Sequence, residues 1–304
     1  MRDAFKKALT ELIESDEKVV LITGDLGFGV FEDIQERFPK QFLNVGVAEQ
    51  NMTAIAAGMA LEGFTVFTYS IGNFPTFRCL EQIRNDASYH DANINIVCTG
   101  GGFSYGALGM SHHATEDLSV MRAIPGVTSV IPSSAWESYE ATKAIASTPG
   151  VGYLRIEKTK SDEVTSDDTF EIGKARRLRE GNHLTILASG GIANEALKAA
   201  DEIKNEKGLE CRVVSMHSLK PIDKEEILSA CTETGGIITL EENNIIGGLG
   251  GAVSEVCMEE GTFPKKFKRI GMDDCFTSVV GSQAYLREYY QMDSGAIIRT
   301  ILEW

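Results

Sequence analysis

The chain has 304 residues, enough for two domains of ordinary size, and its 43% hydrophobic and 24% charged residues exclude a disordered or fibrous protein. Its 29 Lys and Arg against 44 Asp and Glu give a formal net charge of −15, which argues against nucleic acid or an anionic membrane as a partner. No run of about 18 apolar residues occurs, and charged residues fill the N-terminal segment where a signal peptide is apolar, so we expect a cytoplasmic protein.

Apolar runs that predict strands follow one another along the first half of the chain. The runs Val19–Ile22, Thr65–Tyr69 and Ile94–Cys98 are nearly continuous, which is typical of parallel strands buried on both faces of a sheet. Between the first two, Val45–Val47 is predicted as a short strand that leads into a helix over Ala48–Leu61. Small residues fill much of this helix, so another backbone, including that of a second subunit, can approach it closely.

The polar segment 158–169 has no apolar period and is the predicted linker, which places the domains at 1–165 and 172–304. The predicted fold class is α/β, with two domains that are each a mostly parallel sheet flanked by helices. Beyond the linker, predicted strands alternate with predicted helices. The strands are Leu184–Ala188, Cys211–Met216 and Gly236–Leu240, and the helices are 194–207, one that starts at Asp223, and 252–259.

Glu49 is the first residue with a candidate chemical role. It stands among apolar and small residues at the start of the predicted helix. A carboxylate in this position is either solvated and stabilised by the helix macrodipole, or buried with a raised pKa. The local pattern leaves both interpretations open.

A glycine-rich segment at 100–117 follows the strand Ile94–Cys98 directly. Glycines let a ligand approach the backbone at the carboxyl edge of a parallel sheet, where open α/β sheets bind ligands. The segment does not end in Gly-Lys-Ser/Thr, so it is not a Walker phosphate loop. It holds His112 and His113, whose pattern fits either a structural or a catalytic role, and no further His or Cys stands at ligand spacing, so we expect no metal site in this chain. A second glycine run, Gly247–Gly251, is interpreted as a tight turn before a helix.

Two aromatic residues and one arginine complete the candidates from local pattern. Pro75 breaks a strand, which places its neighbours Phe74 and Phe77 on a loop at the strand's end. Arg155 closes the predicted strand Val151–Leu154 and is either a surface residue or an anchor for an anion.

Several segments, in this order, resemble the transketolase family of thiamine-diphosphate enzymes over nearly the whole chain. The resemblance implies a pyrimidine-binding domain followed by a transketolase C-terminal domain, as in the C-terminal subunit of a split transketolase. The segments are Gly46 to Gln50, Phe74 with Arg78 to Arg84, Gly109 to His112 with Glu116 and Asp117, Ser218 to Asp223, and Glu241 to Gly251.

One family feature is absent. The Gly-Asp-Gly stretch ending in Asn that holds magnesium in the family's diphosphate-binding domain does not occur in this sequence. The resemblance therefore implies a separate N-terminal transketolase subunit that carries this domain and the Mg²⁺ ligands. It also implies a dimer of such heterodimers, with thiamine diphosphate between the two domain types, so the chain should be inactive alone.

The resemblance also implies roles at the cofactor. Glu49 is expected to touch the ring nitrogen of the aminopyrimidine, as an acid kept protonated by apolar surroundings, and so to favour the imino tautomer that deprotonates the thiazolium carbon. Phe74, rather than Phe77, is expected to stack on the pyrimidine. Asp25 and Arg78 are expected close to the cofactor, Asp25 also near the subunit contact.

At the substrate, the resemblance implies three further contacts. His112 is expected to bind the hydroxyl and carbonyl region of the donor sugar. Arg155 is expected to grip the sugar phosphate, with Arg2 as a second candidate, because arginine binds phosphate in a bidentate manner.

Other substrate positions depart from the family pattern. Leu108 stands where an Asp usually contacts a substrate hydroxyl, and Gly100 stands where a phosphate-binding His is common. His113 replaces a common Gln and is either a donor to an altered substrate or a structural residue. The loss of a carboxylate and an imidazole changes what the pocket can satisfy by hydrogen bonding, so the substrate need not be an ordinary pentose phosphate.

The expected function is transfer of a two-carbon ketol unit from a ketose to an aldose. The alternatives are chemistry like that of 1-deoxy-D-xylulose 5-phosphate synthase, chemistry like that of the beta subunit of a 2-oxo acid dehydrogenase, or a non-catalytic subunit that keeps the fold. Both enzymatic alternatives release carbon dioxide from a 2-oxo acid, which separates them from ketol transfer.

Overall fold

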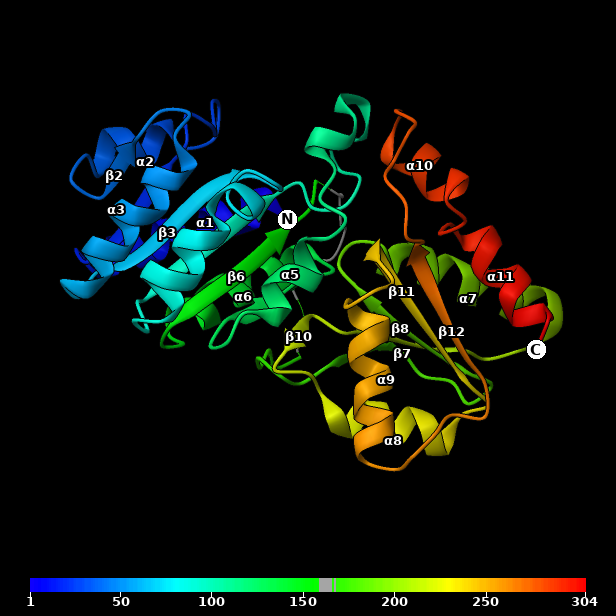
Figure 1. Ribbon diagram of the computed structural model, residues 1–304. Coiled ribbons are helices and arrows are strands. Elements are labelled where there is room, and N and C mark those ends of the chain that lie inside the picture. Colours follow the sequence, from blue (N-terminus) through cyan, green and yellow to red (C-terminus); the bar gives the residue numbers. More distant parts are fainter. Residues whose placement is uncertain (159–165, 167) are drawn as a thin grey trace.

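The computed structural model describes residues 1–158, 166 and 168–304, and within these residues the strands form two sheets flanked by helices (Figure 1). The first sheet has the strand order β10-β5-β6-β4-β3-β1-β2 and the second has the order β12-β11-β8-β9-β7. Neighbouring strands are parallel except for the pairs β10 with β5 and β7 with β9. The predicted α/β class with two mostly parallel sheets is confirmed.

The first sheet is built almost entirely from the N-terminal half of the chain. Its strands are β1 (Val19–Thr23), β2 (Phe42–Asn44), β3 (Thr65–Ile71), β4 (Ile94–Thr99), β5 (Thr128–Val130), β6 (Val151–Ile156) and β10 (Ser218–Lys220). The helices around it are α1 (Arg2–Ser15), α2 (Glu32–Arg37), α3 (Glu49–Leu61), α4 (Leu80–Gln82), α5 (Asp117–Ala123) and α6 (Ala135–Ala146), with the short helices η1 (Phe77–Cys79), η2 (Ile83–Ser88), η3 (Gly106–Leu108) and η4 (Met110–His112).

The second sheet and its helices come from the C-terminal half. Its strands are β7 (Arg176–Arg179), β8 (Thr185–Ser189), β9 (Arg212–Ser215), β11 (Ile237–Asn244) and β12 (Phe267–Met272). Its helices are α7 (Ala193–Lys207), α8 (Lys224–Glu233), α9 (Leu249–Glu259), α10 (Gln283–Tyr289) and α11 (Ser294–Leu302).

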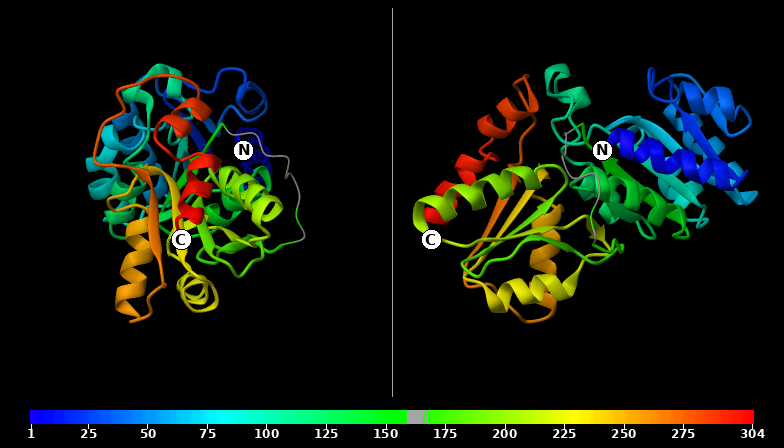
Figure 2. Two further views of the ribbon diagram at one scale, coloured as in Figure 1. Left: turned by 90° about the vertical axis from the view of Figure 1, so that its right-hand side faces the viewer. Right: turned by 180° about the vertical axis from the view of Figure 1, so that it is seen from behind.

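Alternation along the buried strands explains how helices cover both faces of the first sheet. In β1, Val20 and Ile22 share an apolar cluster with Met52 of α3, whereas Leu21 points to the opposite face and packs in the cluster of Phe5 from α1. Successive side chains of a strand point to opposite faces, so a fully apolar run needs a partner layer on each side. The views from the side and from behind show these layers around both sheets (Figure 2).

The two halves are joined by a shared sheet and a shared core. β10 follows β9 in sequence, yet it pairs antiparallel with β5 and so extends the first sheet. One apolar cluster also runs from Ile22 and Ile96 of the first sheet to Val214 and Val253 of the second half. Most of the predicted linker at 158–169 lies outside the described residues, and the domain limits of 165 and 172 stay a prediction.

One predicted strand is wrong. Val45–Val47 are not in a strand, because β2 ends at Asn44 and Gly46 takes a left-handed backbone conformation with φ of 74°. That conformation breaks a strand and turns the chain into α3. The predicted strands at Val19–Ile22, Thr65–Tyr69 and Ile94–Cys98 are confirmed as parts of β1, β3 and β4.

None of the helices in the described part of the chain combines the length and the apolar character that crossing a membrane requires.

Candidate functional site

Glu49 lies at the carboxyl edge of the first sheet as the first residue of α3. Its side chain is only 1% exposed, although Glu is almost never fully buried without a partner. Ser70, near the end of β3, donates a hydrogen bond to Glu49 Oε1 at 3.0 Å, and Arg78 Nη1 donates to Oε2 at 2.6 Å. Gly24 lies directly against it, since a Cβ on that glycine would be 3.2 Å from Glu49 Cγ. Glu49 is therefore buried, in contrast to a solvated carboxylate at a helix start.

The surroundings of Glu49 include charged and polar groups, in contrast to the apolar surroundings that the family resemblance implies. Its ion pair with Arg78 joins a buried carboxyl group to a guanidinium whose side chain is nearly half exposed. A polar network of this kind holds the carboxyl group in one orientation. Arg78 is therefore adjacent to Glu49, as the sequence predicts for two residues of one site.

Phe74 and His112 complete the arrangement. Phe74 lies on the turn between β3 and η1, as predicted, whereas Phe77 is not on the loop but begins η1. The Arg78 guanidinium lies 4.9 Å from the centre of the Phe74 ring, and the His112 ring meets Phe74 edge-on at 5.3 Å between ring centres. We call Glu49, Arg78, Phe74 and His112 the Glu49 cluster. It presents one buried carboxyl group, one aromatic ring and one imidazole.

Asp25 flanks the cluster through its neighbour Gly24. It takes a left-handed conformation with φ of 57°, which two hydrogen bonds to Asn44 stabilise. Asp25 N donates to Asn44 Oδ1 and Asn44 Nδ2 donates to Asp25 Oδ1, each at 3.0 Å. Asn44 also accepts from Gly46 N at 3.0 Å, so it fixes both turns at this edge. Sequence analysis did not single out Asn44.

The predicted phosphate contact of Arg155 is not supported by the structure. Its side chain is 1% exposed and pairs with the buried Asp117, with 3.2 Å between Arg155 Nη1 and Asp117 Oδ1. Nη2 donates to the backbone carbonyl of Glu242 at 2.9 Å, and the backbone of Gly101 covers the guanidinium. Arg155 is thus a buried link between the two halves, with its guanidinium bonded inside the protein.

The predicted substrate contact of His113 is also not supported. Its ring is buried and both nitrogens are occupied, Nδ1 at 2.6 Å from Thr277 Oγ1 and Nε2 at 3.0 Å from Gly106 O. Leu108, by contrast, is 56% exposed, and Gly100 takes a φ of 78° close to Tyr105.

Two basic residues lie on the Tyr105 side of His112. Lys158 Nζ is 3.6 Å from the centre of the Tyr105 ring, which itself lies 6.4 Å from the His112 ring. Burial and then the nearby charge of Arg2 lower the pKa of Lys158. Arg2 is about half exposed and makes a long contact of 3.4 Å with Asp3. Sequence analysis assigned Lys158 to the linker and missed it, because polar residues follow it.

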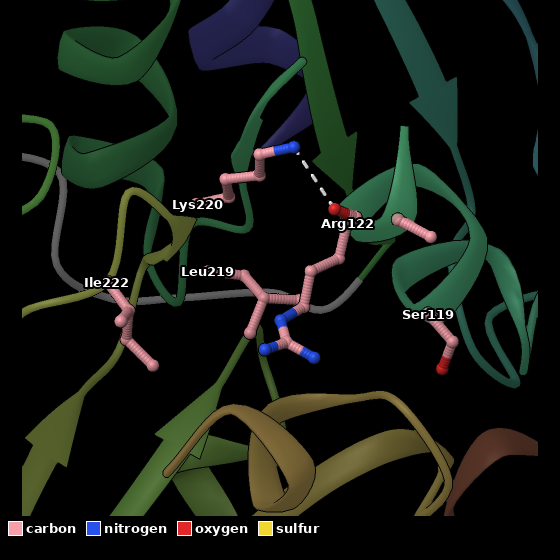
Figure 3. A pocket seen from close by; sticks show the side chains of 6 residues that line it. Ser119, Arg122, Leu219, Lys220 and Ile222 are labelled. Carbon is pink, nitrogen blue, oxygen red and sulfur yellow. Dashed lines mark hydrogen bonds between the residues drawn. The ribbon is translucent and has the colours of Figure 1, made fainter. Parts of the chain in front are cut away.

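A cavity of about 380 Å³ lies between α5 and β10 (Figure 3). Its polar side chains are already bonded within the protein. Lys220 Nζ donates to the backbone carbonyl of Arg122 at 3.1 Å, Arg122 pairs with Glu255, and Ser119 Oγ donates to the carbonyl of Ile246 at 2.7 Å. The polar side chains of this cavity are used to bond segments of the protein to each other, so we place the candidate site at the Glu49 cluster instead. Across the residues that the structure describes, no group of three or more His, Cys, Asp or Glu side chains is arranged to hold a metal ion.

Comparison with known proteins assigns the chain to a family. Residues 1–162 match the transketolase pyrimidine-binding domain, and residues 173–297 match the transketolase C-terminal domain. The chain belongs to the transketolase family. The family order, pyrimidine-binding domain before C-terminal domain, is the one that the motifs predicted.

Relatives of similar length are named as transketolase subunits. The chain is 36% identical over 306 residues to an apulose-4-phosphate transketolase subunit of Phocaeicola vulgatus, and the match covers 100% of this chain and 96% of the relative. It is 34% identical over 305 residues to the 6-deoxy-6-sulfo-D-fructose transketolase subunit of a Clostridium species, covering 100% and 94%. A solved structure described as a split gene transketolase, inactive beta4 tetramer, is 35% identical with a TM-score of 0.88, covering 99% of this chain and 96% of that one.

Proposed function

We propose that this chain is the subunit of a split transketolase that holds the pyrimidine end of thiamine diphosphate. In that role it takes part in moving a two-carbon ketol unit from a ketose to an aldose. The observation that carries the proposal is the Glu49 cluster, because it places a buried carboxyl group, an aromatic ring and an imidazole together at the carboxyl edge of a parallel sheet.

The residues present fit the cofactor. Glu49 offers a carboxyl group and Phe74 is only partly buried, so a flat ring would have both a hydrogen-bonding partner and a stacking surface. Thiamine diphosphate, when bound, supplies the carbanion chemistry that the transfer needs. Glu49 would share a proton with the ring nitrogen, with Ser70 and Arg78 fixing the orientation of its carboxyl group, and Asp25 would flank the same ring.

A separate partner subunit would complete the site. Large apolar side chains follow the carboxyl ends of β1, β2 and β4, where Phe28 is 75%, Val47 is 73% and Met110 is 52% exposed. Their segments lie along the same side of the molecule, at the top of Figure 1. Apolar exposure of this extent favours a covering protein surface. We propose that the N-terminal transketolase subunit covers it and brings the diphosphate site and the Mg²⁺ ligands, in a dimer of heterodimers.

The substrates would be anionic sugars. Arg2 and Lys158 lie near Tyr105 and His112, and in a chain of net charge −15 they form a local basic site for a phosphate or a similar anion. The two relatives above are named for a sugar phosphate and a sulfo sugar, each of which carries an anionic group. His112 would contact the hydroxyl and carbonyl region of the donor, and the exposed Leu108 would face an apolar part of the substrate.

The test is reconstitution from the native host. The chain is purified without disruption, the polypeptide that co-purifies at equal amounts is identified, and the complex is assayed with thiamine diphosphate, Mg²⁺ and a panel of phosphorylated and unphosphorylated ketoses. Ketol transfer that requires an aldose acceptor supports the proposal. Release of carbon dioxide from pyruvate would replace it with one of the decarboxylating alternatives, and no cofactor binding at all would favour a non-catalytic subunit.

A further inference from the structure

The loop that carries His112, residues 100–116, is bound to the C-terminal half of the chain along its length. Four hydrogen bonds each join a residue of the loop to a residue beyond position 240. Phe103 N donates to Glu242 Oε2 at 2.8 Å, Asn244 N donates to Thr115 O at 2.5 Å, Gly281 N donates to Gly106 O at 3.3 Å, and Thr277 Oγ1 meets His113 Nδ1 at 2.6 Å.

The partners of His113 determine its tautomer. The carbonyl of Gly106 can only accept, so His113 Nε2 carries the proton and donates to it at 3.0 Å. In the neutral ring Nδ1 is then an acceptor, and the hydroxyl of Thr277 donates to it. Burial lowers the pKa of His113, which favours this neutral form. The ring thus links the loop to Thr277 immediately beside His112.

Bonds within the N-terminal half hold part of the loop: Gly102 pairs with Ala114, and Asn73 Nδ2 donates to Ser111 O at 3.2 Å and to His113 O at 2.7 Å. Gly100, Gly102 and Gly109 all take left-handed conformations, and glycine loses more conformational freedom on ordering than any other residue. Leu108 and Met110, on either side of Gly109, are exposed and do not anchor it in a core. The bond from Thr277 to the His113 ring adds a contact from the C-terminal half directly beside His112, next to the bonds from Asn73.

We propose that Thr277, through its hydrogen bond to His113, is a positioning residue that holds His112 against Phe74. The C-terminal half then takes part in the reaction indirectly, by fixing a side chain of the pyrimidine-binding half that touches the substrate. This inference rests on the proposed function, since the role of His112 comes from there.

The test compares Thr277→Val with Thr277→Ser in the reconstituted complex. Valine keeps the volume and leaves Nδ1 without a donor, so kcat/KM for the donor ketose should fall about tenfold while the affinity for thiamine diphosphate stays unchanged. Serine keeps the hydroxyl and should retain the wild-type value. Thr232→Val, the same change at an exposed position on α8, is the matched control and should have no effect.

Amide hydrogen exchange in residues 103–113 gives a second readout that needs no activity. Exchange should be faster in Thr277→Val than in wild type and unchanged in Thr277→Ser. Wild-type kinetics and exchange in the valine variant would overturn the proposal, and so would equal losses in the valine and serine variants. A wild-type complex without ketol transfer would refute the proposed function instead, and the exchange comparison would still decide whether Thr277 holds the loop.

Discussion

At the scale of single residues, the proposed chemistry depends most on Glu49. Its pattern in the sequence fits a solvated helix start as well as a buried acid, and only the fold distinguishes them. Burial follows from Ser70 and Gly24, which stand at the ends of two neighbouring strands and meet at the same sheet edge. Contacts between residues more than 20 positions apart in the sequence depend on the register of the strands, which local composition does not give.

Glu49→Gln tests the assigned role directly. Glutamine keeps the shape and hydrogen bonding capacity but cannot exchange a proton, so ketol transfer by the reconstituted complex should fall by about 10²- to 10⁴-fold. Steady-state kinetics at saturating cofactor measure this. Glu81→Gln, on the exposed side of α4, is the control and should leave the rate unchanged. Undiminished transfer by the Glu49 variant would show that the role is wrong.

The buried position of Arg155 leads to a second prediction for a single residue. A lone arginine at a strand end fits an anion anchor, and the sequence does not show that Asp117 and the carbonyl of Glu242 enclose it. Arg155→Met should lower the free energy of unfolding by about 3–5 kcal/mol, because it leaves the Asp117 carboxylate buried and unpaired.

Lys158→Met should instead raise KM for a phosphorylated ketose about tenfold with little change in stability.

Denaturant unfolding and a substrate pair with and without phosphate separate these two outcomes. A folded Arg155→Met protein of normal stability with a raised KM for the phosphate would restore the original assignment of Arg155. Equal effects of Lys158→Met on both substrates would remove Lys158 from the proposed anion site.

At the scale of elements, only Gly247 and Gly248 of the glycine run form the predicted turn, because α9 already includes Gly250 and Gly251. The helix begins at Leu249, and the buried carboxyl group of Glu241 accepts hydrogen bonds from Leu249 N at 2.7 Å and Gly250 N at 2.9 Å. A Cβ at Gly248 would lie 2.0 Å from Glu241 Oε2, so glycine is needed where the turn passes this carboxyl group. The side chain of a strand residue thus caps the following helix.

Because the capping carboxyl group of Glu241 is buried, we expect the stability of the protein to depend on pH. Burial raises the pKa of Glu241 from its ordinary 4.5 to about 7, so between these values the folded protein binds more protons than the unfolded chain. The free energy of unfolding should therefore decrease as pH rises through this window, with a contribution from this group of up to about 3 kcal/mol. Glu241→Gln should flatten that slope. Denaturation curves from pH 4.5 to 8 measure it, with the exposed Glu259→Gln as control, and an unchanged slope in Glu241→Gln would contradict the assignment.

Other elements show why sequence prediction succeeds in some places and fails in others. The buried parallel strands are continuous apolar runs, so β1, β3 and β4 could be predicted. The turn at Gly46 could not be predicted, because Val45 and Val47 on either side are both apolar and the sequence does not show that Gly46 takes a left-handed conformation. β10 has three residues, too few for a pattern, and its place beside β5 results from packing between the halves.

At the scale of the whole molecule, the two halves form a joint structure. The shared sheet, the apolar cluster that spans both halves, and the bonds from Glu242 and Thr277 to the His112 loop all cross between them. The resemblance of motifs predicted the family and the fold, both of which are confirmed. It did not reveal these contacts, because they depend on residues more than 100 positions apart.

In the proposed function, this chain supplies one half of a shared cofactor site. Calorimetric titration of thiamine diphosphate with Mg²⁺ into the chain, into its co-purified partner and into the equimolar mixture tests it most directly. Saturable binding is expected only in the mixture, with a loss of affinity when the mixture contains the Glu49→Gln chain. Binding of equal strength by the chain alone, or by the partner alone, would contradict it.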